Sequence, residues 1–317
     1  MGTIEDSATD WQMMSDQQAK TIRIGVDLGG TKIEAIALDG GGNILFRERR
    51  PTPANDYAMI LDAIWELVSK AEQAAGFVQH IGVGTPGSIS MRTGLMRNSN
   101  TSVLNGKPLD RDLSHRLGKT VHIENDANCF TLSEATDGAG SRASVVFGVI
   151  IGTGVGGGLV VDGKLIAGRN LIAGEWGHNP LPWRQSTDVP DVQCYCGKSG
   201  CIETFLSGIG FVRLCKSLNC TVSTPIDAAR AADSGDPKAI GVIDVYVDYL
   251  ARALAPVINL IDPDAIILGG GLSNINRVYA HICAQLSKYV FSDSLTTPIL
   301  RAAHGDSSGV RGAAWLP

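Results

Sequence analysis

The chain has 317 residues, of which 44% are hydrophobic and 19% charged, and this globular composition excludes disordered, collagen-like and disulfide-scaffold proteins. The net charge is −5 and no run of lysine and arginine occurs, so we expect no nucleic-acid partner. No apolar stretch reaches the length of a membrane span, and residues 1–20 lack the basic and apolar parts of a signal peptide. We therefore expect a cytoplasmic protein without a membrane partner, whose residues 1–20 form a mobile leader.

Strand-like patterns open the first half of the chain. Residues 21–27 and 32–39 flank a Leu28–Thr31 turn, and a Gly40–Asn43 turn leads into a third strand at 44–50. This pattern predicts a three-stranded meander. The next segment, 56–75, is expected to form a helix that ends at Gly76 and places on one face Ile60, Ile64, Leu67, Val68 and Ala71. Further along we expect a strand at 80–89, an irregular stretch at 98–106, a helix at 109–117 and a strand that ends at Asp126, where another helix starts.

The same pattern restarts near Ser144. A strand at 145–151, a turn at 152–154 and a second strand at 156–163 repeat the first hairpin, with Gly152-Thr153 at the place of Gly30-Thr31. This repetition indicates an internal duplication, and two unrelated glycine-rich hairpins are the alternative. The remaining elements are predicted as a helix at 237–260, a buried strand at 265–271, a helix at 278–290 and a last helix from Ser307 or Ser308. The order of elements predicts an α/β protein of two lobes with a similar plan.

Three glycine-rich turns could approach a polyphosphate. The first lies between two strands and contains Asp27, Gly29, Gly30, Thr31 and Lys32; the second contains Gly152, Thr153 and Gly154; the third contains Gly269, Gly270 and Gly271. Glycine lets backbone N–H groups come close to phosphate, and a carboxylate such as that of Asp27 can hold Mg²⁺ or its waters. Any one of these turns could be only a turn, whereas three at matching strand ends favour a single bound nucleotide.

The segment from Glu124 to Asn128 brings carboxylates and amides to the end of an apolar strand. At this junction the Asp126 carboxylate could deprotonate a substrate hydroxyl as that hydroxyl attacks phosphorus. The alternative is that Asp126 only caps the following helix, and the local pattern taken alone favours the cap.

A third group of residues has the composition of a metal site. His178, Cys194, Cys196 and Cys201 supply one imidazole and three thiolates, which is enough for a tetrahedral structural Zn²⁺ site. The spacing differs from that of common zinc fingers, and free thiols are the alternative. Glu175 and Glu203 flank the cluster, and a metal that fixes the loop would also fix these two carboxylates.

These motifs, in this order, resemble those of the ROK family of sugar kinases and sugar-responsive repressors. The similarity covers about Thr21 to Leu316 and includes the run from Gly152 to His178 and the run from Cys194 to Glu203. It implies the actin-like, ribonuclease H-like fold of two duplicated α/β lobes with a cleft between them. The lobes would be 21–128 and 129–304, with a zinc loop at 178–201 and a C-terminal helix at 305–317 that packs back on the first lobe.

The resemblance also implies roles for individual residues. Asp126 would be the base, and the sugar would be held by Asn100, Asn125, Glu175, His178 and Glu203. Asp27 would orient Mg²⁺, and the glycine turns with Thr31, Lys32 and Thr153 would meet ATP. His178 would use one ring nitrogen for zinc and the other for the sugar. A sugar and ATP are then the expected partners, and family members often form homodimers.

The family includes both enzymes and DNA-binding regulators. Only about twenty residues precede the first predicted strand, too few for a winged helix-turn-helix, so the sequence favours the enzyme. The strings GEWGHNPLPW and CYCGKSGCIETFLSG resemble bacterial fructokinases of the family most closely. We therefore expect phosphorylation of D-fructose to D-fructose 6-phosphate, with N-acetylglucosamine kinase or glucokinase and mannokinase as the alternative.

Overall fold

The computed structural model describes residues 21–222 and 224–317, so the leader predicted for residues 1–20 lies outside the described residues. The chain divides into two compact units. Unit 1 comprises the described residues up to Cys129 together with Ser307–Pro317, and unit 2 comprises the described residues of Phe130–Asp306. The division falls inside helix α4 (Asp126–Thr136) and just before helix α10 (Ser308–Trp315).

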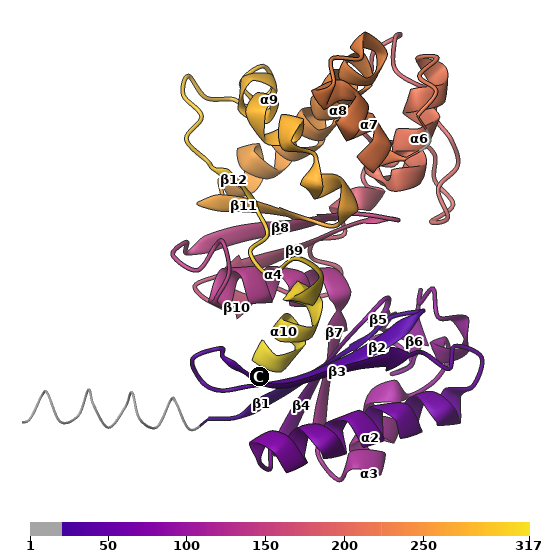
Figure 1. Cartoon of the computed structure of the whole chain (residues 1–317), viewed down its shortest axis with the longest axis vertical. Coiled ribbons are helices and arrows are strands. Elements are labelled where there is room, and N and C mark those ends of the chain that lie inside the picture. Colours follow the sequence, from indigo (N-terminus) through magenta and orange to yellow (C-terminus); the bar gives the residue numbers. More distant parts are fainter. Residues whose placement is uncertain (1–20, 223) are drawn as a thin grey trace, which may run out of the picture. The chain divides into compact units, whose positions relative to one another are not determined.

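Unit 1 is built on a five-stranded sheet in the order β3-β2-β1-β4-β7 (Figure 1). The strands are β1 (Arg23–Leu28), β2 (Lys32–Leu38), β3 (Ile44–Pro51), β4 (His80–Thr85) and β7 (Thr120–Asn125). The first three pair antiparallel, as the predicted meander requires, whereas β4 and β7 add in parallel beside β1. The carboxyl ends of β1, β4 and β7 consequently lie at one edge of the sheet, where ligands bind in open α/β sheets.

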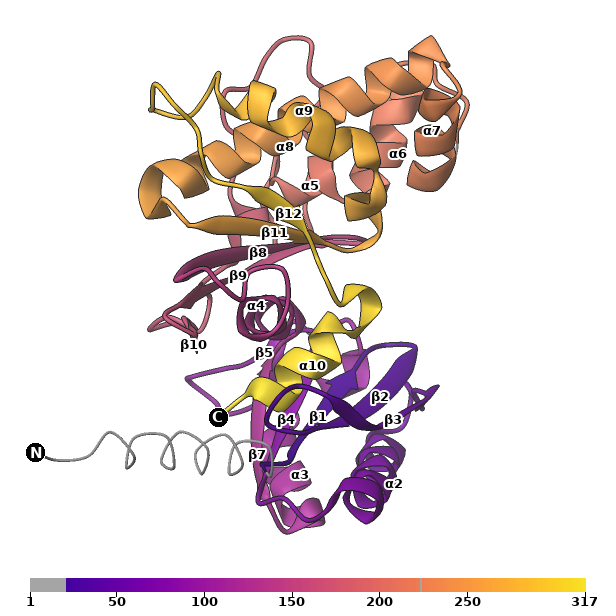
Figure 2. The same ribbon diagram turned by 60° about the vertical axis from the view of Figure 1, so that its left-hand side comes forward.

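Helices cover both faces of this sheet. Helix α2 (Tyr57–Ala75) begins at its N-cap Asp56 and ends at Gly76, and the apolar face predicted for it is buried. It lies with α3 (Leu109–Leu117) on one face, while α10 lies on the other (Figures 1 and 2). Short elements complete the unit: β5 (Ser88–Ile89), β6 (Met96–Arg97) and η1 (Ser102–Leu104). The second boundary between the units falls inside η4 (Gly305–Ser307), which leads to α10.

Helix α10 can pack against the sheet because glycines remove the side chains between them. A Cβ on Gly25 of β1 would lie 2.3 Å from Ala314 N, and one on Gly82 of β4 would lie 1.7 Å from Ala313 O. These distances are far below van der Waals contact, so only glycine permits this approach. The C-terminal helix is therefore an integral part of unit 1, close to the end of β1.

Unit 2 repeats the sheet plan of unit 1. Its order is β10-β9-β8-β11-β12, with an antiparallel β8-β9-β10 meander and β11 and β12 added in parallel. The strands are β8 (Val145–Ile151), β9 (Val155–Val161), β10 (Lys164–Leu165), β11 (Ala265–Gly269) and β12 (Ile299–Arg301). The two sheets thus share one order and one set of directions, which confirms the duplication expected from the two glycine-rich hairpins.

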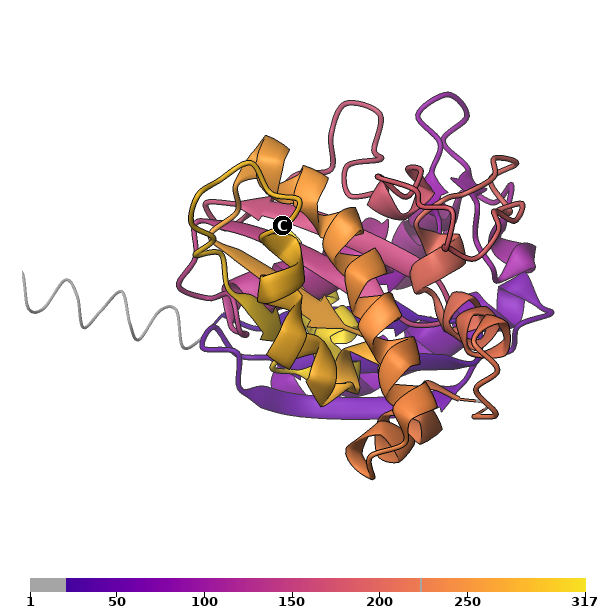
Figure 3. The same cartoon turned by 90° about the horizontal axis from the view of Figure 1, so that it is seen from above.

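The core of unit 2 lies between its sheet and a layer of helices. The long helix α8 (Pro237–Ile261) contributes the most buried residues and lies beside α9 (Asn276–Leu286), as Figures 2 and 3 show. The opposite face of the sheet is covered by α4, where a Cβ on Gly269 would lie 2.3 Å from the Phe130 ring. The other elements of this unit are η2 (Trp176–His178), α5 (Glu203–Leu206), α6 (Gly208–Ser217), α7 (Pro225–Asp233) and η3 (Gly271–Asn274).

Two predicted boundaries in unit 2 are wrong. The strand predicted at 265–271 ends at Gly269, because Gly270 has a positive φ of 82° and turns the chain into η3. The helix predicted at 278–290 spans Asn276–Leu286, and the N–H of Ser287 caps it by donating to Cys283 O and Gln285 O. Among the described helices, no segment has both the length and the apolarity to cross a membrane.

Candidate functional site

In unit 1, the first glycine motif forms the tight turn between β1 and β2. The Gly29 N–H donates to Lys32 O at 3.0 Å, and the Thr52 hydroxyl donates to Gly29 O at 2.7 Å. Thr31, at the tip, is exposed, so its hydroxyl and the surrounding backbone can reach a ligand. The motif is a β-hairpin, as the sequence predicts, and not a strand–loop–helix phosphate loop.

Two carboxylates lie at the strand ends beside this turn. Asp27 pairs across the sheet with Gly84 of β4, and Gly84 pairs with Glu124 of β7, two residues before Asp126. Because Gly84 has no side chain, nothing from β4 fills the space next to Asp27. Burial and, second, the negative charge of Asp126 raise the pKa of Asp27 to about 7, although Lys32 opposes the shift. Two buried carboxylates this close would be stabilised by a cation.

Asp126 is the first residue of helix α4, but a neighbouring side chain serves as a cap. The N–H of Ala127 donates to Asn125 Oδ1 at 2.9 Å, the contact expected of a helix N-cap one residue before the helix. Asp126 Oδ1 also accepts from the N–H of Ala127 at 2.9 Å. Burial raises the pKa of Asp126, which makes its carboxylate a better proton acceptor. Helix capping therefore does not require Asp126, and its carboxylate can serve chemistry.

Amide and hydroxyl groups lie near these carboxylates and the turn. A Cβ on Gly30 would lie 3.8 Å from Asn100 Oδ1 and 3.4 Å from Thr101 Oγ1. The Asn125 amide donates to Gly87 O at 3.3 Å. Sequence reasoning missed Thr101, which is 3% exposed and whose hydroxyl has no hydrogen-bond partner among the described residues. Its only signal was its position directly after Asn100.

In unit 2, the second glycine turn is joined to Glu203. The Glu203 Oε2 atom accepts from the N–H of Val155 at 3.0 Å, and a Cβ on Gly154 would lie 2.8 Å from that oxygen. The turn itself is closed by a bond from Gly152 N to Gly154 O at 3.0 Å, while Thr153 is exposed at its tip. A side chain at position 154 would therefore make the carboxylate of Glu203 shift from its place at this turn.

The third glycine cluster lies next to the second. Strand β11 pairs with β8 so that Gly269 faces Ile150, and a Cβ on Gly270 would lie 2.5 Å from Ile151 O. Gly271 then opens η3, and apart from its chain neighbours and the backbone of this short helix no atom of the described residues lies within 4 Å of its Cβ position. The structure therefore brings together the two clusters that the sequence assigned to the nucleotide in this half of the chain.

The His178 and cysteine cluster has the geometry of a tetrahedral metal site. The four ligand atoms, His178 Nδ1 and the Sγ atoms of Cys194, Cys196 and Cys201, all lie within 4.8 Å of one another. The Cys194 Sγ to Nδ1 distance and the Cys196 to Cys201 Sγ–Sγ distance are both 3.6 Å. Zn–S bonds of about 2.3 Å and Zn–N bonds of about 2.0 Å place tetrahedral ligands about 3.6 to 3.8 Å apart. The donor set and its spacing therefore fit Zn²⁺.

The second ring nitrogen of His178 points to polar groups instead. Nε2 lies 2.8 Å from the hydroxyl of Tyr195 and 3.9 Å from Glu175 Oε2. Burial, together with Glu203 and Glu175, raises the pKa of Tyr195 to about 12, so the phenol stays protonated. Tyr195 is a second residue that sequence reasoning missed, because its position between two cysteines does not show which group its hydroxyl meets.

The predicted residues thus fall into two sets. Unit 1 contains Asp27, the Gly29–Lys32 turn, Asn100, Asn125 and Asp126, and unit 2 contains the Gly152–Gly154 and Gly269–Gly271 turns, Glu175, Glu203 and the metal cluster. Each set is assembled within its own unit.

Comparison with known proteins defines the class. The ROK family model matches residues 23–317, so the chain belongs to the ROK family. It is 40% identical over 296 residues to the N-acetyl-D-glucosamine kinase of an Escherichia coli strain, covering 92% of this chain and 98% of that protein.

Solved structures agree with this assignment. The ROK hexokinase of Thermus thermophilus matches with a TM-score of 0.81 and 30% identity, over 93% of this chain and 97% of that one. A ROK family glucokinase of Streptomyces griseus, solved with glucose and AMPPNP, matches with a TM-score of 0.74 and 30% identity, over 93% and 98%. The fold is the actin-like duplicated α/β fold of ROK sugar kinases, as the motifs led us to expect.

Proposed function

We propose that this protein transfers the γ-phosphoryl group of ATP to the primary hydroxyl of a hexose. The observation that carries the proposal is the Asp126 carboxylate, which directly follows the carboxyl end of β7 and lies next to Asp27. Asn125 also caps helix α4, so the cap does not depend on Asp126 alone. Its kinase relatives, 40% identical over nearly their whole length, support the same reaction class.

Asp126 is the base in this proposal. Its carboxylate accepts the proton of the sugar hydroxyl while that oxygen attacks the γ-phosphorus and the bond to the β-phosphate oxygen breaks, which releases ADP. Asn100 and Asn125 would hold neighbouring hydroxyls from unit 1, and Glu175, His178 and Glu203 would do so from unit 2.

The nucleotide would be held by backbone and by a cation. The Gly29–Lys32 turn and the Gly152–Gly154 turn offer N–H groups and the hydroxyls of Thr31 and Thr153 to phosphate, and Gly269–Gly271 would border the nucleoside. Asp27 fits Mg²⁺, because it is a hard oxygen ligand whose pKa is raised to about 7 by burial and, second, by the charge of Asp126. When bound, Mg²⁺ neutralises charge on the phosphates during transfer.

Zinc would have a structural role. Bound by His178 Nδ1 and the three thiolates, it would fix the loop that carries Tyr195 and leads to Glu203. His178 Nε2, which lies 2.8 Å from the Tyr195 hydroxyl, would exchange that partner for a sugar hydroxyl. Four protein ligands leave no open position on the metal, as is typical of structural sites.

The acceptor sugar is best supported as N-acetyl-D-glucosamine, for which the relatives at 40% identity are named. D-fructose, which the sequence strings favour, stays a prediction, and the comparisons favour the alternative over it. Both sugars are compatible with the same Asp126 chemistry, so the difference concerns pocket shape.

An ADP-release assay with Mg-ATP tests the proposal. Wild-type protein is given N-acetyl-D-glucosamine, D-fructose, D-mannose and D-glucose, and kcat/KM is compared. We expect turnover, with the highest kcat/KM for N-acetyl-D-glucosamine and a 6-phosphate product by phosphorus NMR. A preference for fructose would replace the acceptor and keep the reaction, whereas no turnover on any of the four would overturn the proposal.

A further inference from the structure

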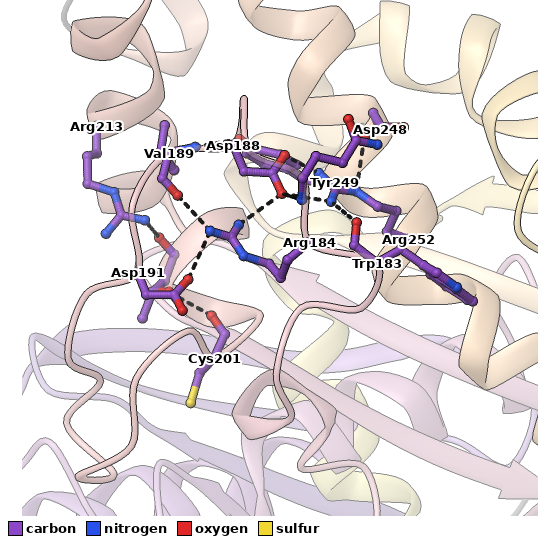
Figure 4. A network of polar contacts seen from close by, with 12 residues as sticks. Trp183, Arg184, Asp188, Val189, Asp191, Cys201, Arg213, Asp248, Tyr249 and Arg252 are labelled. Carbon is purple, nitrogen blue, oxygen red and sulfur yellow. Dashed lines mark hydrogen bonds and ion pairs between the residues drawn. The ribbon is translucent and has the colours of Figure 1, made fainter.

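A buried guanidinium fastens the segment between His178 and Cys194 to helix α8. Arg252 has no exposed side-chain surface, and its two terminal nitrogens donate to the two oxygens of Asp188 at 2.9 and 2.7 Å. It also donates to the carbonyl of Trp183 at 2.8 Å, and its Nε lies 3.0 Å from Asp248 Oδ2 (Figure 4). A bidentate pair fixes the orientation of the carboxylate as well as its place. The segment 183–188 is therefore held against α8.

Arg184 extends this contact toward the cysteine loop. It donates to Asp188 Oδ2 at 3.1 Å and to Val189 O at 2.9 Å, and its Nη2 lies 3.0 Å from Asp191 Oδ1 (Figure 4). Arg184 therefore connects the carboxylate held by Arg252 to a second carboxylate that lies nearer the cysteines.

Asp191 packs directly against the cysteine loop at Gly200. A Cβ on Gly200 would lie 2.9 Å from Asp191 Oδ2, and the Gly200 N–H donates to Val192 O at 3.3 Å. Gly200 precedes Cys201, whose thiol lies 3.5 Å from the carbonyl oxygen of His178. A shift of Asp191 would therefore move Cys201, one of the four candidate metal-binding residues.

The same arginine supports the helix that starts at Glu203. The Arg184 guanidinium lies 4.5 Å from the centroid of the Phe205 ring in α5, in cation–π contact. Arg213 also contacts this short helix, because it donates to Thr204 O at 2.8 Å and lies 5.4 Å from the centroid of the Phe205 ring. Arg184 therefore contacts both Asp191, which packs against the cysteine loop, and Phe205, which lies in the helix that begins at Glu203.

We propose that Arg184, Asp188 and Arg252 are positioning residues that hold the cysteine loop and Glu203 in place for the metal and the sugar. The inference rests on the proposed function, because these three residues contact neither the reacting atoms nor the sugar and would act only by positioning the residues that do.

The energetics favour positioning over stability as the purpose of this network. Removing two charges from water costs several kcal/mol, so a buried ion pair stabilises a fold little compared with apolar side chains of equal size. The pair does, however, fix one loop conformation through directed hydrogen bonds, and Asp188 receives a further one from Gln185 N at 2.8 Å. The residues 183–191 thus have one defined position beside the cysteines.

Arg184→Met is the variant to test, because the Arg184 side chain is 31% exposed and methionine keeps packing against Phe205. Zinc release to a chelator and steady-state kinetics are measured on the full chain. We expect zinc release about 5- to 10-fold faster and a sugar KM raised by a similar factor, with kcat changed less than about twofold. Arg184→Lys keeps the positive charge but loses the planar guanidinium with its several donors, so its zinc release rate and sugar KM should fall between those of the wild type and Arg184→Met.

Arg277→Met is the matched control. Arg277 is 29% exposed and lies 3.0 Å from Asp244 on α8, but it does not contact the 183–191 segment in the described structure. We expect wild-type zinc release and KM in this variant. Equal behaviour of the two methionine variants would overturn the proposal.

A second readout separates this proposal from the proposed function. In chelator-treated protein, the rates at which a thiol reagent labels Cys194 and Cys201, both buried, report loop position without zinc or activity. Faster labelling in Arg184→Met than in Arg277→Met supports the positioning role even if the wild type phosphorylates no sugar. Unchanged labelling contradicts it even if the wild type is an active kinase.

Discussion

The two units share one sheet plan and differ in the chemistry at the strand ends. The match of Gly30-Thr31 with Gly152-Thr153 places Asp27 of β1 at the position of Val149 in β8, which is fully buried. Unit 1 has its carboxylates at the ends of β1 and β7, with Asp27 in β1 and Asp126 directly after β7, whereas unit 2 carries Glu175, His178 and Glu203 on the long segment between β10 and β11. Under the proposed function, the duplicated fold would supply two phosphate turns, with the acid–base chemistry in one unit and the metal-fixed binding loop in the other.

The largest effect is expected from Asp126→Asn. Asparagine keeps an oxygen acceptor and removes the base, so kcat should fall by about 10³-fold while sugar affinity changes little. Steady-state kinetics with the best sugar measure this. The control is Asp62→Asn, an exposed acid of α2 paired with Arg116. Full turnover in Asp126→Asn would reduce Asp126 to the first residue of a helix.

Loss of a candidate zinc ligand should weaken sugar binding by unit 2. Cys196→Ser is expected to lower zinc content, raise the sugar KM about 10-fold and lower the Tm by several degrees, because a loop that carries His178 and leads to Glu203 loses its anchor. Metal analysis, kinetics and thermal melting measure these. Cys283→Ser, an exposed cysteine outside the cluster, should leave all three unchanged. A wild type without zinc would make the cluster a thiol-rich loop.

The raised pKa of Asp27 predicts a pH-dependent stability difference. Between its ordinary value of 3.8 and about 7, folded Asp27 binds more protons than unfolded Asp27, so the free energy of unfolding falls as pH rises through this window. Asp27→Asn removes this loss. Without Mg²⁺ and nucleotide, we expect its Tm to exceed that of the wild type by roughly 3 °C at pH 8 and to match it near pH 4. The same difference at both pH values would contradict the assignment.

The smallest effect concerns Tyr195, which contacts the His178 nitrogen assigned to the sugar. An exposed neutral hydrogen bond contributes about 1 kcal/mol, so Tyr195→Phe should free Nε2 and lower the sugar KM about 2- to 5-fold at constant kcat. Kinetics at saturating ATP measure this, with Tyr57→Phe of unit 1 as the control. A raised KM in Tyr195→Phe would show that the hydroxyl binds the sugar instead of competing with it.

The sequence predicts local structure in this chain better than it predicts contacts between distant segments. The α2 face and the two hairpins follow from periodicity and turn residues, so their positions were predictable. The cap at α4 was not, because Asn125 and Asp126 are both favoured capping residues and both side chains accept from the N–H of Ala127. Only the start of the helix at Asp126 shows that Asn125 holds the N-cap position.

Long-range pairing accounts for most of what the sequence could not predict about the site. Gly270 lies against Ile151 because β11 pairs with β8, and no local pattern encodes the pairing of strands this far apart. The burial of Arg252 could not be predicted either. A charged residue within a helical pattern is expected to be exposed, and only its ion pair with Asp188 explains why this side chain is fully buried.

One measurement tests the division of labour between the units most directly: the sugar Kd by calorimetry and the kcat at saturating sugar, for Asp126→Asn and Cys196→Ser side by side. The account predicts that Asp126→Asn binds sugar like the wild type but barely turns over, and that Cys196→Ser binds about 10-fold more weakly but keeps most of its kcat. Equal losses of binding and turnover in both variants would contradict it.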